Sequence, residues 1–553
     1  MSLKKVNAVI VGAGAGGGVV AKELSTAGMS VVLLEQGDWI SYDEHTNDEL
    51  ISQRVTVLGN SCGPSDEKTK RIFVHPDGNK DIVLPSESPF NNIAACVGSG
   101  TVTYGALAWR FMEEDFKMRS IYGQVAGSTL EDWPISYDEL EPFYEKAEWE
   151  FGVSGDATEN PFAAPRKKPY PMPAFTHNKE ATLLNEAAKR LGLHPFSIPM
   201  LRNSVPYNGR PACYRMRTCV GFPCPVNAKA GTQNTVIPVA LKTGNCELRT
   251  HCIVNEIFVN EAGKITGVSY FDKNNKKQIQ PADIVIVSAS AIETPRLLLN
   301  SKSRFFPYGI GNENDWVGRN LQGHPYYSAF GLFEEEIYDD VGPGSSVALC
   351  DFNHHNPGII GGGYLSNSFI RMPYSFANLR PPGEKMWGKK HKEFQRMNFK
   401  KMAEIHGPYQ QIPKFDNRVE VDNTVRDSWG IPVAKLSGTT HEENSKGCAY
   451  LADKAEIWLK EAGAIHTWKQ IPKNSDVIAG QHQAGTCRMG NDPKTSVTDK
   501  FGRIHSIPNL FIADASLHVT NGGFNPVLTI MALGYRIGGY IASEWLKGNR
   551  FKS

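Results

Sequence analysis

Three glycines near the start of the chain have the spacing of a phosphate-binding turn. Gly12, Gly14 and Gly17 form the pattern G-x-G-x-x-G. In such a turn the first glycine allows a tight bend, the second lets the backbone approach a pyrophosphate, and the third lets a helix pack on a strand. Glu35 ends the next apolar stretch, where a carboxylate would accept hydrogen bonds from ribose hydroxyls. The pattern predicts a dinucleotide site, and the alternative is a turn that is merely rich in glycine.

Three cysteines form a second group with chemical potential. Cys213, Cys219 and Cys224 fall within 12 positions of one another, whereas the other seven of the ten cysteines are scattered. Thiolates at short spacing on irregular backbone can converge on an iron–sulfur cluster, and three of them suit a 3Fe-4S cluster. Zinc normally takes four ligands, and no fourth Cys or His lies within ten residues. The sequence therefore favours an iron–sulfur cluster, with free or disulfide-paired thiols as the alternative.

The elements around the glycines support a nucleotide-binding fold. We predict an apolar strand at residues 6–11, a helix at 19–27 and a second buried strand at 31–34, which together make a βαβ unit. Because strand, helix and acid are all in place, the merely glycine-rich turn is disfavoured. Further apolar patterns predict strands at 254–259, 265–271 and 284–287, and helices at 140–149, 293–300 and 526–546.

The nucleotide-fold pattern is dispersed along the chain, because it returns near residues 284–300 and again after 505. A chain that leaves and re-enters its nucleotide domain is typical of flavoenzymes, which favours FAD over NAD. The expected fold class is an α/β (α+β composite) protein. It has a Rossmann-like FAD-binding domain and a second, substrate-binding domain built on an antiparallel sheet. The expected boundaries are 1–155, 235–325 and 475–553 for the first, 326–474 for the second, and 156–234 for a bridging segment that holds the cysteine cluster.

Composition excludes several classes of protein. The 553 residues are 41% hydrophobic and 21% charged, so the chain can build two or three domains or one large composite core. With 59 basic and 58 acidic residues the net charge is +1, and no global field would attract nucleic acid. No apolar run approaches the roughly 18 residues that would span a bilayer. The apolar run at residues 8–11 reads as a strand, so we expect no export signal within the chain.

Seven segments with recognisable motifs stand in order along nearly the whole chain. The first is VIVGAGAGGG with Glu35, and the last two are NLFIADAS and NPVLTI. Between them come the segments at residues 96–105, 290–301, 317–325 and 482–490. Together they resemble the glucose-methanol-choline (GMC) flavin oxidoreductases. The resemblance implies a bound FAD and an enzyme that oxidises a hydroxyl group. A degenerate flavin-fold binding protein is the non-enzyme alternative.

The resemblance also implies which residues act on the substrate. Oxidising an alcohol removes a hydride to the flavin N5 and a proton to a base. His482 stands where the family has that base, and an imidazole is mostly neutral near pH 7. Asn525 would hold the substrate oxygen over the flavin. The alternative for His482 is a satisfied core histidine, and His324 and His518 are interpreted as structural.

Flavin contacts follow from position in the same way. The resemblance implies a glycine-rich segment along the flavin, adenine held by the backbone of one residue, and an acid facing the ribityl or pyrophosphate group. With the motif glycines and Glu35, the cofactor-binding set is therefore expected to include Gly98, Gly100, Val254, Asp514, Asn525 and Pro526.

Within the family the chain is most similar to bacterial sugar dehydrogenases, such as glucoside 3-dehydrogenases and gluconate or sorbitol dehydrogenases. We expect the enzyme to oxidise a secondary hydroxyl of a sugar or glycoside. The leading candidate is the hydroxyl on carbon 3 of glucosides or galactosides. The alternatives are carbon 1 of glucose, gluconate or a polyol, and an oxygen-using alcohol oxidase. The C-terminal half is rich in aromatic and polar residues that suit a sugar better than a sterol, among them Tyr364, Trp387, His406, Tyr409 and Gln410.

A cluster beside the flavin implies one-electron transfer to an acceptor outside the chain. The resembling dehydrogenases pair with a small subunit that carries a twin-arginine signal, and they donate electrons to a cytochrome c or a quinone. We therefore expect those partners, and a periplasmic site reached by co-export, with a cytoplasmic enzyme as the alternative.

Overall fold

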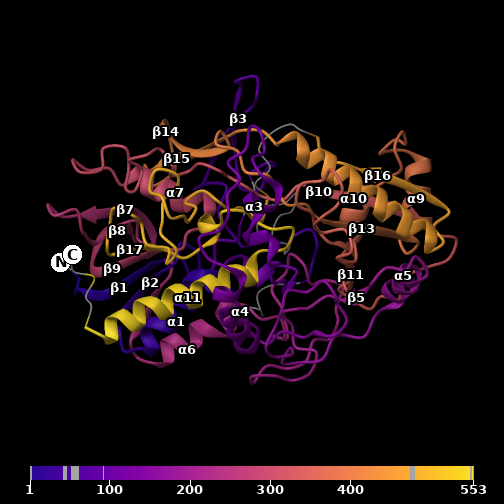
Figure 1. Cartoon of the computed structure of the whole chain (residues 1–553), viewed down its shortest axis with the longest axis horizontal. Helices are drawn as coiled ribbons and strands as arrows, with labels where there is room; N and C mark the ends of the chain where they lie inside the picture. Colours follow the sequence, from indigo (N-terminus) through magenta and orange to yellow (C-terminus); the bar gives the residue numbers. More distant parts are fainter. Residues whose placement is uncertain are drawn as a thin grey trace.

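The computed structural model describes residues 3–41, 47–51, 62–90, 93–473, 480–548 and 551. Two large sheets lie toward opposite ends of an elongated molecule, and both termini lie beside the first of them (Figure 1). This arrangement confirms the expected fold class, a Rossmann-like part joined to a part built on an antiparallel sheet.

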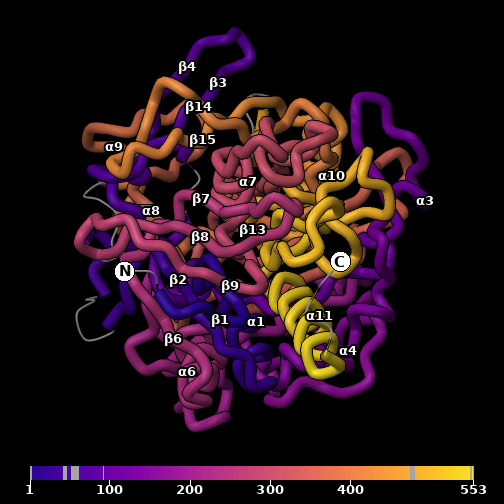
Figure 2. The backbone as a smooth tube through the Cα atoms, turned by 90° about the vertical axis from the view of Figure 1, so that its left-hand side faces the viewer, coloured from indigo at the N-terminus to yellow at the C-terminus, as the bar shows by residue number. Residues whose placement is uncertain are grey.

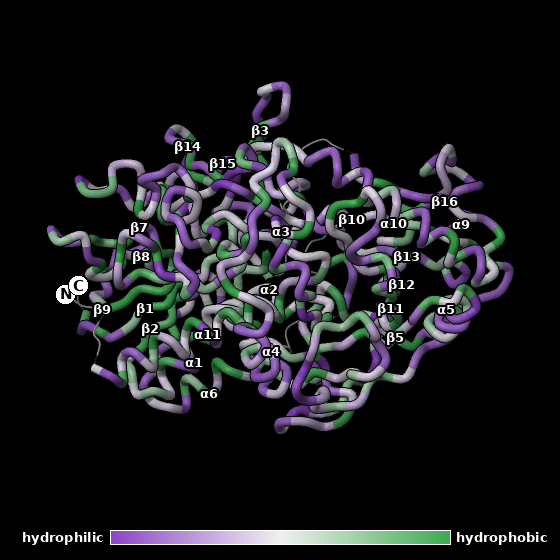
Figure 3. Tube along the Cα trace, viewed as in Figure 1, coloured by the Kyte–Doolittle hydropathy of each residue, from purple (hydrophilic) through white to green (hydrophobic). Residues whose placement is uncertain are grey.

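The first sheet has seven strands, in the order β6-β2-β1-β9-β8-β7, with β17 also paired to β9. Strands β6, β2, β1, β9 and β17 run parallel, and β9, β8 and β7 form an antiparallel extension. The parallel strands at the centre are almost wholly apolar because helices or other strands cover both faces (Figure 3). Their bounds are β1 Val6–Val11, β2 Val31–Leu34, β6 Cys246–Arg249, β7 Ile253–Val259, β8 Ile265–Phe271, β9 Lys277–Val287 and β17 Leu510–Ile512.

Helices α1, α4, α6 and α11 gather along one side of this sheet (Figure 1). Their bounds are α1 Ala15–Thr26, α4 Tyr137–Phe151, α6 Val236–Lys242 and α11 Val527–Leu546. Helix α1 begins earlier than the predicted residue 19, so Gly16, Gly17 and Gly18 lie inside it. They are glycines for packing reasons, because a Cβ at Gly16 would lie 1.7 Å from the carbonyl oxygen of Ala513.

The second sheet has six antiparallel strands in the order β16-β10-β13-β12-β11-β5. Helices α5 and α10 pack beside it around a buried aromatic, Trp458. The bounds are β5 Phe196–Ser197, β10 Tyr326–Leu332, β11 Val347–Leu349, β12 Leu365–Asn367, β13 Met402–Pro408, β16 His466–Gln470, α5 Lys179–Arg190 and α10 Glu442–Glu461.

A smaller sheet of four strands, in the order β14-β15-β3-β4, lies beside helix α7 (Ser290–Asn300). Its strands are β3 Arg71–Val74, β4 Lys80–Val83, β14 Arg418–Arg426 and β15 Pro432–Ser437. The β3–β4 hairpin projects from the body of the molecule (Figure 2). This sheet joins segments that the predicted boundaries assign to different domains, and β5 of the bridging segment joins the six-stranded sheet. The boundaries themselves stay a prediction.

Short elements complete the part of the chain that the structure describes. They are α2 Gly100–Thr103, α3 Met118–Tyr122, α8 Pro373–Ala377, α9 Lys389–Asn398 and 3-10 turns at Glu114–Phe116, Thr232–Asn234 and Ala515–Leu517. Within that part, none of the helices combines the length and the apolar character needed to cross a bilayer.

Candidate active site

Two adjoining cavities run from the first turn of the Rossmann-like part to the six-stranded sheet. The smaller, of about 140 Å³, is lined by Gly12, Gly14, Glu35 and Val254, and we call it the glycine cavity. The larger, of about 680 Å³, is the central cavity. Its lining includes Gly14, Gly100, His482, Asp514, Asn525 and Pro526. Both cavities share Gly14, Ser99, Ser288 and Ser290, so a long ligand can occupy them together.

The glycine turn is built as the spacing predicts. Gly12 has a φ of +100°, and a Cβ there would lie 2.3 Å from the carbonyl oxygen of Ser288. A Cβ on Gly17 would lie 2.0 Å from the carbonyl oxygen of Gly12. Gly14 differs, because its nearest neighbour would be the Ser99 Cβ at 3.3 Å. The fold therefore requires Gly12 and Gly17, whereas Gly14, at the N-terminus of α1, is small on the side that faces the cavities.

Glu35 is buried beside this turn and lines the glycine cavity. Its Oε2 accepts a hydrogen bond from the Ala13 amide at 2.8 Å, and its Oε1 accepts one from the Gly37 amide at 3.0 Å. Burial raises the pKa of this carboxyl, and the amide hydrogen bonds oppose that shift. Val254 lies in the same wall, at an irregularity in the pairing of β7 with β8. The carboxylate is thus held in place and still presents lone pairs to a ribose hydroxyl.

The other expected flavin contacts fall into two groups. Gly100 and Pro526 line the central cavity directly. Gly98, with a φ of +96°, donates its amide to the carbonyl oxygen of Ala13 and so braces the glycine turn. Asp514 lines the central cavity as well, but its oxygens accept hydrogen bonds from the Ser290 amide, the Thr294 hydroxyl, and the Ser516 amide and hydroxyl. The acid therefore fixes the start of α7 against the end of β17.

The two residues expected to act on substrate meet in the central cavity. The Nδ2 atom of Asn525 lies 3.3 Å from Nε2 of His482. The amide of Asn525 is oriented from its other side, because the Tyr364 hydroxyl donates to its Oδ1 at 2.7 Å. Tyr364 is itself stacked on Trp109, with ring centroids 4.4 Å apart. The structure thus brings the predicted base and the predicted amide donor together on one wall.

Further residues at the site were not assigned a catalytic role from the sequence. Nδ1 of His482 lies 2.8 Å from Nδ1 of His324 and 3.4 Å from the hydroxyl of Tyr326. His324 is buried, and burial lowers its pKa to about 4. His406, on β13, lines the cavity with Tyr326, and burial lowers its pKa while Glu404 opposes the shift. The signal for His324 was the segment 317–325 itself, which ends on this histidine and a proline.

The five aromatic and polar residues that suggested a sugar pocket separate in space. Tyr364 contacts Asn525, and His406 lines the central cavity. Trp387 is 70% exposed on the surface, next to α9. Tyr409 donates its hydroxyl to the carbonyl oxygen of Ile360 within the core. The composition indicated that this half of the chain is rich in aromatic and polar residues. Which of these residues line the cavity could be seen only in the folded structure.

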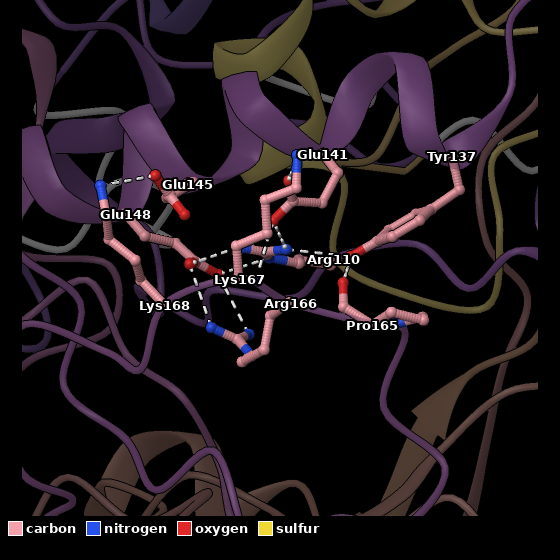
Figure 4. Close-up of polar contacts among 9 residues, drawn as sticks. All are labelled: Arg110, Tyr137, Glu141, Glu145, Glu148, Pro165, Arg166, Lys167 and Lys168. Atoms are coloured by element: carbon pink, nitrogen blue, oxygen red, sulfur yellow. Dashed lines mark hydrogen bonds and ion pairs between the residues drawn. The ribbon is translucent and has the colours of Figure 1, made fainter.

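An ion network surrounds Arg110, the residue that follows Trp109 in the chain. Arg110 donates from Nε and Nη2 to both carboxylate oxygens of Glu148, at 2.8 and 2.7 Å, and Arg166 approaches the same carboxylate at 3.1 and 3.2 Å (Figure 4). Arg110 also reaches Tyr137 and Glu141. The carboxylate of Glu148 is wholly buried, and its two guanidinium partners offset the cost of burying its charge.

The cysteine loop adjoins the central cavity. Val220 and Gly221 line that cavity, and the Gly221 amide donates to the carbonyl oxygen of Thr103 at 2.7 Å. Cys213, Cys219 and Cys224 are free thiols. Within the described ranges, no group of three or more His, Cys, Asp or Glu side chains has an arrangement that could hold a metal ion. The predicted 3Fe-4S site stays a prediction.

Two cations are buried next to this loop. Lys229 donates to the carbonyl oxygens of Tyr104, Cys219 and Phe222, at 3.2, 3.1 and 2.8 Å. Arg202 donates to the carbonyl oxygen of Gly105. For the part of the chain that is described, none of these partners is a carboxylate. Burial raises the pKa of the Cys219 thiol, but the positive charges of Arg202 and Lys229 outweigh it, so the net shift is downward.

The chain matches a known protein family and is similar to several known proteins. Models of the GMC oxidoreductases match residues 128–326 and 413–534. The chain is 29% identical to the fructose dehydrogenase large subunit of Gluconobacter japonicus, over 98% of both chains. It is 28% identical to the gluconate 2-dehydrogenase flavoprotein of Pantoea cypripedii, over 99% of this chain and 95% of the relative. Paromamine 6'-oxidase of Streptomyces fradiae is 27% identical, over 97% and 91% respectively.

Solved structures share the fold. A pyridoxine 4-oxidase from Mesorbium loti superimposes with a TM-score of 0.62 at 14% identity, over 97% of this chain and 98% of that one. A formate oxidase variant from Aspergillus oryzae superimposes with a TM-score of 0.65 at 15% identity, over 99% of this chain and 100% of that one. These likenesses concern the fold.

Proposed function

Since the chain belongs to the GMC oxidoreductases, a family of FAD-dependent enzymes that act on hydroxyl groups, we propose that it is a sugar dehydrogenase. Its substrate is a sugar or glycoside, and the enzyme oxidises a secondary hydroxyl to a ketone. The leading candidate is the hydroxyl on carbon 3 of a glucoside or galactoside. The observation that carries the proposal is the convergence of His482 and Asn525 on one wall of the central cavity.

The residues present fit FAD. Gly14 offers a side-chain-free approach at a helix N-terminus, which suits a pyrophosphate, and Glu35 presents acceptor lone pairs to a ribose. Bound FAD supplies an acceptor for the hydride that leaves the hydroxyl-bearing carbon. The glycine cavity would hold the adenosine part, and the shared wall at Gly14 leads into the central cavity.

His482 takes the proton of the substrate hydroxyl, and Asn525 donates its amide to the same oxygen. The amide can play this part because Tyr364 holds its Oδ1 and so directs Nδ2 at the reacting oxygen. One hydroxyl proton leaves to His482 and one hydride leaves from carbon, so the product is a carbonyl. General-base assistance of this kind contributes about 10²–10⁴-fold to a rate.

Two observations support a sugar as substrate. The central cavity presents polar groups from several sides, including Tyr326, His406 and Gln483. Such groups match the hydroxyls of a sugar better than the aliphatic surface of a sterol. In addition, two relatives that align over nearly the whole chain are named as dehydrogenases of fructose and of gluconate.

A panel of sugars tests the substrate class. Holoenzyme is mixed anaerobically with glucose, fructose, gluconate, sorbitol and methyl glucosides, flavin bleaching is recorded, and the product is identified by NMR. Methyl glucosides have a blocked carbon 1, so their conversion to a 3-ketone supports carbon 3. Bleaching by free glucose alone, with a lactone as product, favours carbon 1. Absence of bleaching by every sugar contradicts the proposal.

For the electrons we propose an exit through an iron–sulfur cluster held by Cys213, Cys219 and Cys224 to a cytochrome c or quinone. The proximity of the loop to the central cavity supports this exit, as do Arg202 and Lys229, whose buried positive charges would balance an anionic cluster. The thiols would have to come together on the iron, so we derive no step through the cluster.

Iron content tests the cluster. About three irons per chain, lost in the Cys219→Ser variant while reduction of FAD by sugar persists, supports it. Iron far below that ratio, with undiminished reduction of an acceptor, contradicts it. Rapid turnover with oxygen and no other acceptor instead identifies an alcohol oxidase.

We propose that the enzyme works in the periplasm, exported with a small partner subunit that carries a twin-arginine signal. The cytoplasm is the alternative. Fractionation of the native host, with and without the partner's gene, distinguishes the two, because loss of the partner should leave the enzyme in the cytoplasm.

A further inference from the structure

His324 lies behind the proposed base, and among the described residues the partners beside one of its ring nitrogens are both acceptors. Its Nε2 is 2.8 Å from the carbonyl oxygen of Gly522 and 3.2 Å from that of Asn521. A carbonyl oxygen cannot donate, so Nε2 of His324 must carry a proton to make either contact. Because burial keeps this histidine neutral, its Nδ1 then has no proton and can act only as an acceptor.

The protonation of His324 determines which ring nitrogen of His482 carries the proton. The two Nδ1 atoms are 2.8 Å apart, and a hydrogen bond between them needs one proton. Since Nδ1 of His324 is the acceptor, Nδ1 of His482 is the donor. In a neutral imidazole the other nitrogen, Nε2, then carries a lone pair, and this is the atom that faces the amide of Asn525 at 3.3 Å. The Asn525 amide donates there, so this contact and the contact with His324 agree on one tautomer.

We propose that His324 is a positioning residue that holds His482 as the tautomer with its proton on Nδ1 and its lone pair on Nε2 directed at the substrate hydroxyl. This inference rests on the proposed role of His482 as the base. In the opposite tautomer Nε2 would carry a hydrogen and could not accept the hydroxyl proton.

The same pair also determines where the abstracted proton stays. After His482 accepts it on Nε2, its ring is an imidazolium that still donates from Nδ1 to His324. Burial makes His324 a weak base, so the proton remains on His482. The Tyr326 hydroxyl oxygen lies 3.4 Å from the same Nδ1 and is a second hydrogen-bond acceptor for the imidazolium.

Asn and Leu at position 324 form a matched pair of variants, because the two side chains have nearly the same shape. Both remove the donation to Gly522, but only Asn can place an acceptor oxygen toward His482. We expect His324→Leu to slow anaerobic reduction of FAD at saturating sugar by about 10²-fold or more, as loss of a tautomer-setting partner does elsewhere. His324→Asn should retain within about tenfold of the parent rate. The sugar Kd and the FAD content should change less than about threefold in both.

Equal slowing in both variants, or equal loss of FAD, would reduce His324 to a packing role. A parental rate in His324→Leu overturns the inference too, and comparison with His482→Ala locates the failure. If FAD is reduced slowly in His482→Ala but at the parent rate in His324→Leu, only the tautomer inference fails. If FAD is reduced fast in His482→Ala, the assignment of His482 as the base fails.

A measurement on the unchanged holoenzyme needs no variant to fold. With ¹⁵N-labelled histidine, and the His482 signals assigned by difference from His482→Gln, the nitrogen shifts report which ring atom is protonated. The inference requires a protonated Nδ1 and an unprotonated Nε2 in oxidised enzyme above pH 7. The reverse pattern contradicts it.

Discussion

Replacing Tyr364 by Phe removes one oxygen atom and tests how the Asn525 amide is oriented. The Tyr364 hydroxyl donates to Oδ1 of Asn525 at 2.7 Å, and nothing else about the stacked ring on Trp109 needs to change. A single hydrogen bond contributes about 0.5–1.5 kcal/mol. If that free energy is what keeps Nδ2 toward the substrate, its loss slows flavin reduction by about 2- to 12-fold, since 1.36 kcal/mol corresponds to tenfold.

Tyr327→Phe is the matched control. Its hydroxyl donates at 2.8 Å to the backbone carbonyl of Tyr364, and the ring is equally buried. The control should lower thermal stability slightly and leave the rate of flavin reduction unchanged. Stopped-flow reduction at saturating sugar measures both variants. A parental rate in Tyr364→Phe, or equal slowing in Tyr327→Phe, would refute the orientation of Asn525 by Tyr364.

Four further substitutions test the roles of other residues. Gly12→Ala should lower the Tm, because its φ is +100° and Ser288 blocks a Cβ, whereas Gly14→Ala should keep the Tm and lose FAD absorbance on gel filtration. Glu148→Gln should lower the stability, by up to about 3–5 kcal/mol read from denaturant unfolding, because Arg110 and Arg166 lose their shared carboxylate and Arg110 keeps its longer contact with Glu141. Burial raises the pKa of Glu180 from 4.5 to about 8. The protonated carboxyl therefore makes its whole contribution to folding stability below pH 4.5, and that contribution is lost as the pH rises through 8. Glu180→Gln should therefore match the parent near pH 4.5 and exceed its Tm above pH 8, and a constant gap across that range would contradict the assignment.

The local part of the fold could be predicted from the sequence. The strands at residues 6–11, 31–34 and 265–271 are found where the apolar runs indicate, because a strand covered on both faces must be apolar. The family resemblance and the use of FAD are confirmed in the same way, since they depend on short motifs.

Long-range pairing could not be predicted in this way. Nothing in residues 71–83 indicates that they pair with residues 418–437, because the register is set by packing between distant segments. The start of α1 was placed too late for a similar reason, since its glycines are selected by the approach of Ala513.

The candidate site shows the same division. His482, Asn525 and Glu35 belong to motifs and lie where those motifs imply, on the walls of the two cavities. Asp514 also belongs to a motif, but its oxygens serve Ser290, Thr294 and Ser516, which only the fold could reveal. The contact between His324 and His482 joins residues 158 positions apart, so no local pattern predicts it.

The most direct test of the central claim is the rate at which sugar reduces the bound flavin in His482→Gln. The variant keeps a polar side chain of similar size, so FAD should remain bound. The account predicts anaerobic reduction slower by about 10²–10⁴-fold at saturating sugar, with the substrate Kd little changed. Flavin reduction at close to the parent rate, in a variant that retains its FAD, would contradict the assignment of His482 as the base.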